Sequence, residues 1–320
     1  MTGRTVTGAM LAVVLGLTVT GCSTAAEKPS PAASSTARSN TAGPTTQTTI
    51  PRSTPLSPTR SGTVSKVLVF IAENHSLSQM RSQMPYAFGL AQRFGYATAY
   101  TAIRHPSLPN YIAIASGQTY GISNDDSPSA NPVRGESVFG QAVASGKTAT
   151  VYADGMPQNC ATADGGSSYA VKHNPWAYFV NERSTCQKLD VPVGQFAPAI
   201  TRGTLPNVGM VIPNLCHDAH DCPLGVADGW FKGWMTRVFE GADWKSGHLA
   251  VVLTADEDDR SAGNAVLTVI IHPSLKAKVV TTGLTHYSLT RLYEEVAGLP
   301  YLSGAATAPS MATAFGLRLR

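Results

Sequence analysis

The stretch that decides the fold is KVLVFIAEN, residues 66–74. An apolar run of this length that ends in a carboxylate and a carboxamide is typical of a strand buried on both faces of a parallel sheet. In such sheets, ligands bind at the carboxyl ends of the strands. We therefore expect Glu73 and Asn74 to belong to a functional site.

Similar apolar runs follow along the chain, and most of them end in polar residues. They are TATVYAD (148–154), NVGMVIPN (207–214), HLAVVLTADEDD (248–259) and AVLTVIIHP (265–273). Between them lie segments with helical spacing, several closed by glycine: 86–95, 111–117, 137–146, 229–240 and 285–300. This alternation predicts an α/β fold, a doubly wound and mostly parallel sheet with helices on both faces.

The first 63 residues are not expected to belong to this domain. An apolar run, Met10–Val19, follows Arg4 and leads to Val-Thr-Gly-Cys22, which resembles a bacterial lipobox. Residues 1–22 are therefore predicted to be a lipoprotein signal peptide with Cys22 as the lipidated residue, although an ordinary signal peptide with a chance cysteine is the alternative. Residues 23–63 are rich in Ser, Thr and Pro and predict a disordered tether. The folded domain is expected at 64–320.

Four cysteines remain after Cys22, namely Cys160, Cys186, Cys216 and Cys222. An even number in an exported chain favours two disulfides, and closeness in sequence favours 160–186 and 216–222 among three pairings. A zinc site in CHDAHDC (216–222) is the alternative. The net charge of +4 is carried mostly by the signal peptide and tether, and no charge run suggests a nucleic-acid partner.

The segment RHPSLPNYIAIASG, residues 104–117, places Ser107 between two prolines at the start of a predicted helix. A helix cap is one interpretation of Ser107. A nucleophile is the other, because carboxylate and imidazole groups are numerous enough to hold a divalent cation that activates a hydroxyl. Asn110 would then donate a hydrogen bond to a phosphoryl oxygen.

Seven segments occur in an order that carries a family resemblance: IAENHS, HPSLPNYIAIASG, YADGMP, KHNPWAYF, PNLCHDAHDC, TADEDD and THYSLTRLYEEVAGLP. Together they resemble the bacterial phosphoesterase family of phospholipases C and secreted acid phosphatases, most closely the mycobacterial acid phosphatases. The resemblance covers about 64–305. It implies an alkaline phosphatase-like fold, divalent metal and a metal-held phosphoserine or phosphothreonine intermediate.

The same resemblance implies roles for individual residues. It implies metal ligands at Glu73, Asn74, Asp256 and Glu257, and catalytic roles for Ser107, Asn110 and His286. His105 is expected to act as a general acid or on the substrate side. Substrate-side or supporting positions are expected for His173, Asn214, Asp218 and His220. For His173 a purely structural hydrogen bond is an equal alternative.

The expected function is a metal-dependent, acid phosphatase-like phosphomonoester hydrolase that acts on extracytoplasmic phosphate esters through a phosphoserine. It would face the extracytoplasmic side of the cell membrane, anchored through lipidated Cys22. Two alternatives remain: a phospholipase C-type phosphodiesterase, whose substrate would be a phospholipid, and a non-catalytic binding lipoprotein on the same fold.

Overall fold

Strand β1 (Lys66–Ala72) lies in the middle of an eight-stranded sheet with the order β5-β4-β6-β1-β7-β8-β2-β9. The computed structural model describes residues 62–320. The predicted signal peptide, the lipidation site Cys22 and nearly all of the predicted tether lie outside the described residues. Within the described part, no helix is both long and apolar enough to cross a membrane.

The other strands of this sheet are β2 (Gly95–Ala97), β4 (Ala149–Ala153), β5 (Asp190–Pro192), β6 (Val208–Ile212), β7 (Leu249–Ala255), β8 (Thr268–Ile271) and β9 (Lys278–Val280). A separate parallel pair joins β3 (Tyr100–Thr101) to β10 (Leu284–Thr285). β1 pairs in parallel with β6 and β7, with Val67 opposite Val208 and Ala250. The carboxyl ends of these three central strands therefore reach the same edge.

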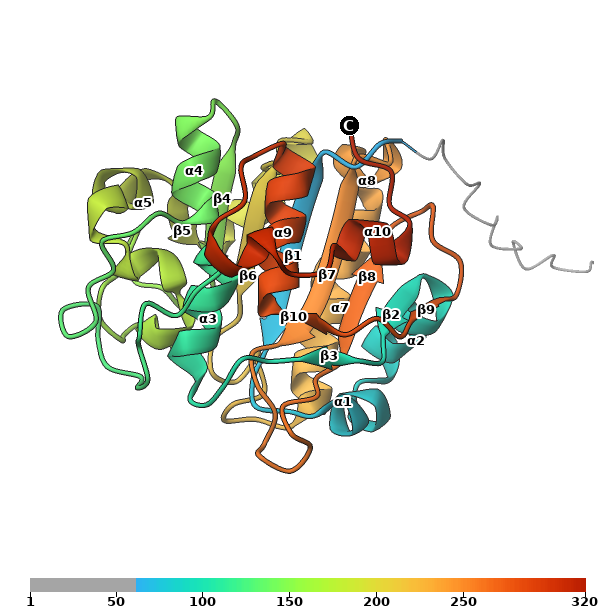
Figure 1. Ribbon diagram of the computed structural model, residues 1–320, viewed down its shortest axis with the longest axis horizontal. Helices are drawn as coiled ribbons and strands as arrows, with labels where there is room; N and C mark the ends of the chain where they lie inside the picture. The colour runs from blue at the N-terminus through green and yellow to red at the C-terminus, as the bar shows by residue number, and fades with distance from the viewer. Residues whose placement is uncertain (1–61) are drawn as a thin grey trace, which may run out of the picture. The chain divides into compact units, whose positions relative to one another are not determined.

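Ten α-helices are described: α1 (Leu77–Gln83), α2 (Pro85–Arg93), α3 (Ser107–Ser116), α4 (Val138–Ala144), α5 (Arg183–Leu189), α6 (Phe196–Arg202), α7 (Leu224–Glu240), α8 (Ala242–Lys245), α9 (His286–Ala297) and α10 (Met311–Phe315). Short 3₁₀ turns are η1 (Val171–His173), η2 (Pro175–Tyr178), η3 (Val180–Glu182), η4 (Val193–Gln195) and η5 (Ser303–Ala306). Helices α3, α4, α9 and α10 lie on the viewer's side of the sheet, and α7 lies behind it (Figure 1). The predicted helix-covered α/β sheet is thus confirmed.

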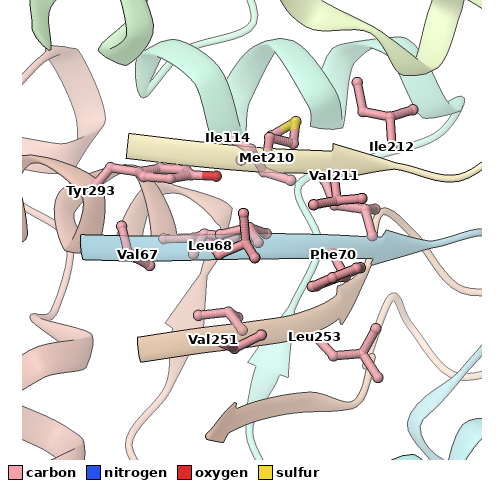
Figure 2. Packing of buried hydrophobic residues seen from close by; sticks show 14 of the residues in the cluster. Val67, Leu68, Phe70, Ile114, Met210, Val211, Ile212, Val251, Leu253 and Tyr293 are labelled. Atoms are coloured by element: carbon pink, nitrogen blue, oxygen red, sulfur yellow. The ribbon is translucent and has the colours of Figure 1, made fainter. Parts of the chain in front are cut away.

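The core forms around β1 because this strand is apolar on both faces. On one face, Phe70 packs against Phe231 of α7, with ring centroids 5.1 Å apart. On the other, helix α9 contacts β1 and its neighbour β6, where Tyr293 donates a hydrogen bond to the Gly209 carbonyl at 2.9 Å (Figure 2). Full burial of one such large side chain stabilises the fold by roughly 1.5–3 kcal/mol. Strand β1 is thereby fixed in place, and with it the residues that follow it.

Strand β8 departs from the parallel pattern. It runs antiparallel to both β7 and β2. The segment between β7 and β8, residues 256–267, contains no helix. A parallel neighbour is usually reached through a helical crossover, and this connection, which has no helix, instead returns the chain in the opposite direction.

Both predicted disulfides, Cys160–Cys186 and Cys216–Cys222, are present. Because all four sulfurs are paired, the alternative of a zinc site in 216–222 is wrong. The first bridge joins α5 to the loop after β4. The second closes the loop after β6, which carries Asp218 and His220.

Candidate active site

Glu73, the first residue after β1, is fully buried, and three side chains from distant parts of the chain contact its carboxylate. The Ser107 hydroxyl donates to its Oε2 at 3.1 Å, and the Tyr111 hydroxyl donates to its Oε1. His173 Nε2 lies 3.2 Å from Oε2. Burial alone would raise the pKa of Glu73, but His173 and Tyr111 outweigh it and hold the pKa below its usual value.

Ser107 is the first residue of α3, and its side chain makes no capping hydrogen bond; Pro106 stands at the cap position. The interpretation of Ser107 as a helix cap is therefore wrong. Tyr111 follows one turn later, so both hydroxyls lie on the same side of the helix and meet the same carboxylate. Gly117 ends the helix with φ 71°, as the glycine pattern predicts.

His173 lies between two carboxylates. Its Nδ1 is 3.2 Å from Asp218 Oδ2, while Nε2 faces Glu73, and its ring stacks on Tyr111 with centroids 5.1 Å apart. Burial disfavours the charged ring, but the two carboxylates prevail and raise the pKa of His173 to about 10. The Glu73, His173 and Asp218 donor atoms all lie within 4.8 Å of one another.

The end of β7 forms the second half of the site. Asp256 is fully buried, and its Oδ1 accepts the Asn74 backbone N–H at 3.2 Å. Burial, together with the charges of Glu73 and Glu257, raises the pKa of Asp256 well above its usual value. Four buried carboxylates, Glu73, Asp218, Asp256 and Glu257, thus gather at one edge of the sheet.

His105 bridges Glu257 and Asp258, at 3.1 Å from each carboxylate. Burial raises the pKa of Glu257 to about 7, against the opposing effect of His105. Asn110 donates to Glu257 Oε2 at 3.1 Å and to the Arg104 carbonyl at 2.6 Å, while its Oδ1 accepts the Ile103 N–H. Its amide therefore organises the loop that carries His105, and its contact with a phosphoryl oxygen stays a prediction.

His286 is fully buried, and both ring nitrogens have partners. Nε2 lies 2.6 Å from the Asp256 carbonyl, and Nδ1 lies 3.0 Å from the Tyr100 hydroxyl. Burial lowers the pKa of His286 to about 4, so the ring is neutral at physiological pH. This geometry suits a residue that positions Asp256.

Two further predicted residues lie outside the carboxylate cluster. Asn214 Oδ1 accepts the backbone N–H groups of Cys216 and His217, so it shapes the disulfide loop. His220 is partly exposed, and its ring nitrogens contact Asp221 and Lys172.

Several buried polar atoms of the site lack a hydrogen-bond partner: Asn74 Oδ1, Asp256 Oδ2, Asp218 Oδ2 and His173 Nε2. Buried polar groups are rarely left unpaired, because the loss of hydration is costly. Hard oxygen and nitrogen donors with excess negative charge fit a divalent cation.

Sequence reasoning missed five residues in and around this site: Tyr111 contacts Glu73, and Asp258, Tyr100, Lys172 and Asp125 contact other residues of the site. The available signals were weak. Tyr111 is four residues after Ser107, Asp258 adjoins the Asp-Glu pair, and Lys172 precedes His173. No pattern in the sequence indicates Asp125 or Tyr100.

A profile of the Phosphoesterase family matches residues 69–300. The chain is 29% identical over 257 residues to the phosphatidylinositol-3-phosphatase of Mycobacterium tuberculosis, covering 79% of this chain and 84% of that protein. It is 30% identical over 220 residues to the phosphate-repressible acid phosphatase of Penicillium chrysogenum, covering 64% of this chain and 52% of that protein. The chain thus spans about half the length of this fungal relative.

Among solved structures, a protein of the alkaline phosphatase superfamily from Vibrio parahaemolyticus aligns with a TM-score of 0.56 at 12% identity. The alignment covers 80% of this chain and 72% of that one. A likeness at this identity concerns the fold alone, and it confirms the predicted alkaline phosphatase-like architecture.

Proposed function

Because the chain belongs to the Phosphoesterase family and is a phosphoric ester hydrolase, we propose that it is a metal-dependent phosphomonoesterase with Ser107 as the nucleophile. The observation that carries this proposal is the buried hydrogen bond from the Ser107 hydroxyl to Glu73, at the edge where the four carboxylates gather. A serine hydroxyl is a weak nucleophile unless a base, a lowered pKa or a metal activates it.

The reaction has two steps. In the first, Ser107 Oγ attacks phosphorus and gives up its proton, the bond to the leaving oxygen breaks, and the leaving alcohol takes a proton in exchange. In the second, water attacks the phosphoserine, the bond from phosphorus to Oγ breaks, and Ser107 regains its proton as inorganic phosphate leaves. Glu73 accepts a hydrogen bond from the Ser107 hydroxyl and so orients Oγ for attack.

The residues that would hold a divalent cation are Glu73, Asn74, Asp256 and Glu257, with Asp218 beside them. His173, protonated between Glu73 and Asp218, stays a hydrogen-bond donor in this arrangement. When bound, the cation would neutralise charge on the phosphoryl group and lower the pKa of a nearby hydroxyl. Tyr111 and His286 hold two of the carboxylate ligands in position. Tyr111 donates a hydrogen bond to the Glu73 side chain, and His286 contacts the backbone carbonyl of Asp256.

His105 is the better candidate for protonating the leaving group. Its side chain is 18% exposed and lines an open pocket with Asp258 and Arg260, so a leaving alcohol can approach it. His286 has no exposed surface, and both its nitrogens are occupied. General acids of this kind typically contribute 10²–10⁴-fold to the rate.

The names of the relatives support the proposed substrate class. Both reported relatives carry names of enzymes that act on phosphomonoesters. We further propose that residues 1–22 are a lipoprotein signal peptide, that 23–63 tether the phosphoesterase domain at 64–320, and that hydrolysis takes place outside the cytoplasm. The two disulfides support export to an oxidising compartment.

The test is hydrolysis of p-nitrophenyl phosphate by the full chain and by Ser107→Ala. We expect the variant to lose at least about 10³-fold in kcat, since residual catalysis without the nucleophile is small. Ser116→Ala is the matched control, because Ser116 is a buried serine of the same helix whose hydroxyl donates to the backbone carbonyls of Ile112 and Gln118. Acid quenching followed by peptide mass spectrometry should find phosphate on Ser107.

Full activity of Ser107→Ala would refute the nucleophile assignment. Faster turnover of bis(p-nitrophenyl) phosphate and phosphatidylcholine than of p-nitrophenyl phosphate would favour the phospholipase C-type alternative. Activity that survives exhaustive chelation would refute metal dependence.

A further inference from the structure

A carboxylate occupies the start of α3, directly beside the proposed nucleophile. Asp125 Oδ1 accepts the backbone N–H of Leu108, the residue after Ser107, at 2.9 Å. Asp125 Oδ2 lies 3.2 Å from the Lys172 ammonium. Asp125 belongs to the loop after α3, and its side chain reaches back to the start of that helix.

Lys172 lies near enough to the carboxylate cluster for the charges of Glu73 and Asp256 to act on its ammonium. Its Nζ also lies 3.5 Å from His220 Nε2, and the next residue is His173. Burial opposes the charge of Lys172, but Asp125, Glu73 and Asp256 raise its pKa. The side chains of Lys172 and Asp125 keep 22% and 29% of their surface exposed, so both reach solvent at the rim of the site.

A second observation indicates that a ligand belongs here. His173 is 1% exposed, and its Nε2 has no hydrogen-bond partner although it faces Glu73, the acceptor for Ser107. An unpaired N–H donor, an N-terminal backbone N–H and an ammonium are the groups that bind a phosphoryl oxygen in proteins. A carboxylate oxygen binds to the same kinds of group. Asp125 contacts two of them here, the Leu108 N–H and the Lys172 ammonium.

We propose, on the basis of the proposed function, that Lys172 and the Leu108 N–H form the binding site, here called the seat, for a phosphoryl oxygen of the substrate. Asp125 fills this seat in the free enzyme and leaves it when phosphate binds. Lys172 is then a phosphate-binding residue, and Asp125 is an internal competitor that sets the affinity for phosphate. The seat lies one residue from Ser107, where an oxygen of the phosphoryl group under attack has to be held.

The two residues are predicted to act in opposite directions, which a purely structural ion pair would not do. Isothermal titration with inorganic phosphate, using the full chain in one buffer with the same divalent metal, measures the affinity directly. Lys172→Met should weaken phosphate binding about 10-fold or more, since hydrogen bonds to charged groups are worth about 1.5–3 kcal/mol. Lys172→Arg should restore most of the affinity.

Asp125→Asn should tighten phosphate binding several-fold, because it removes the competing charge and frees Lys172. The inhibition constant of phosphate against p-nitrophenyl phosphate should follow the same order. Lys147→Met is the control, since Lys147 is an exposed lysine just before β4, at the opposite edge of the sheet.

Unchanged phosphate affinity in Lys172→Met would overturn the proposal, as would weaker binding in Asp125→Asn. Thermal unfolding of each variant separates loss of fold from loss of binding, and the conservative Lys172→Arg and Asp125→Asn variants keep the fold. The titration needs no turnover. Ser107→Ala activity therefore tests the nucleophile independently, and either proposal can fail alone.

Discussion

At the scale of single residues, Glu73 shows how much one buried carboxylate organises. Its two oxygens accept the hydroxyls of Ser107 and Tyr111 and face the His173 ring. The strand pattern predicts Glu73, because an apolar run that ends in acid is a visible signal. Tyr111 was missed because an aromatic residue in an apolar helix segment is usually a core residue, and only the fold shows where its hydroxyl points.

Tyr111→Phe tests this supporting contact. The substitution keeps the ring and its stacking on His173 but removes the donor to Glu73. We expect affinity for a divalent cation to fall about 10-fold or more, as is typical when a partner of a metal ligand is removed. Titration of the metal-free protein, followed calorimetrically, measures this.

Tyr293→Phe is the matched control for Tyr111→Phe. Tyr293 is also fully buried, but its hydroxyl binds the Gly209 carbonyl within the core (Figure 2). Its removal should lower stability by about 1 kcal/mol and leave cation affinity unchanged. Equal cation affinity in wild type and Tyr111→Phe would contradict the supporting role of Tyr111.

At the scale of elements, the order of strands and helices was largely predictable, and the path of the connections was not. The residues of β1, β4, β6 and β7 show the apolar runs and polar ends of central parallel strands. β8 has the same apolar character, yet runs antiparallel, because direction depends on the connection and not on the strand's own residues. Lys172 and Asp125 lie on connections, where periodicity gives no signal.

The two disulfides fix two such connections and should differ in their effects. Their sequence separations are 26 for Cys160–Cys186 and 6 for Cys216–Cys222. Loop-closure entropy then assigns about 3.5 kcal/mol to the longer loop and about 2 kcal/mol to the shorter one. Only the shorter loop carries Asp218, which contacts His173.

Replacing Cys160 and Cys186 by alanine should therefore lower the melting temperature more, while replacing Cys216 and Cys222 should lower kcat/KM more. Each double variant is the control for the other. Paired measurements of thermal unfolding and p-nitrophenyl phosphate hydrolysis give both quantities. A Cys216/Cys222 variant with wild-type kcat/KM would show that the disulfide does not hold Asp218 in its working position.

At the scale of the whole molecule, a net charge of +4 coexists with a local cluster of acidic side chains. Glu73, Asp218, Asp256 and Glu257 are all buried at one edge of the sheet, and His173 is the buried cation that Glu73 and Asp218 share. Like charges at such distances repel strongly where water is excluded. This repulsion is therefore expected to lower the stability of the folded protein, and a bound cation is expected to restore it.

Cation binding should accordingly raise thermal stability. A ligand that binds the folded state at about 1,000 times its dissociation constant adds about 4 kcal/mol, or roughly 8–16 °C for a domain of this size. We expect a rise of this order when Mg²⁺, Mn²⁺, Ca²⁺ or Zn²⁺ is added to the chelator-treated full chain at pH 7.5. Differential scanning calorimetry measures it.

Two variants make this prediction specific to the carboxylate cluster. Asp256→Asn keeps an acceptor for the Asn74 N–H but removes a carboxyl group whose ionisation burial and the neighbouring carboxylates oppose. It should therefore melt no lower than wild type in chelator and lose most of the cation-induced rise. Asp228→Asn changes a different buried aspartate, which accepts the Tyr86 and Ala87 N–H groups at the start of α2. It should melt lower than wild type and retain the full rise, because Asp228 takes no part in the cluster. If no divalent cation shifts the wild-type transition, or if Asp228→Asn loses the rise as fully as Asp256→Asn, the cluster is not a cation site.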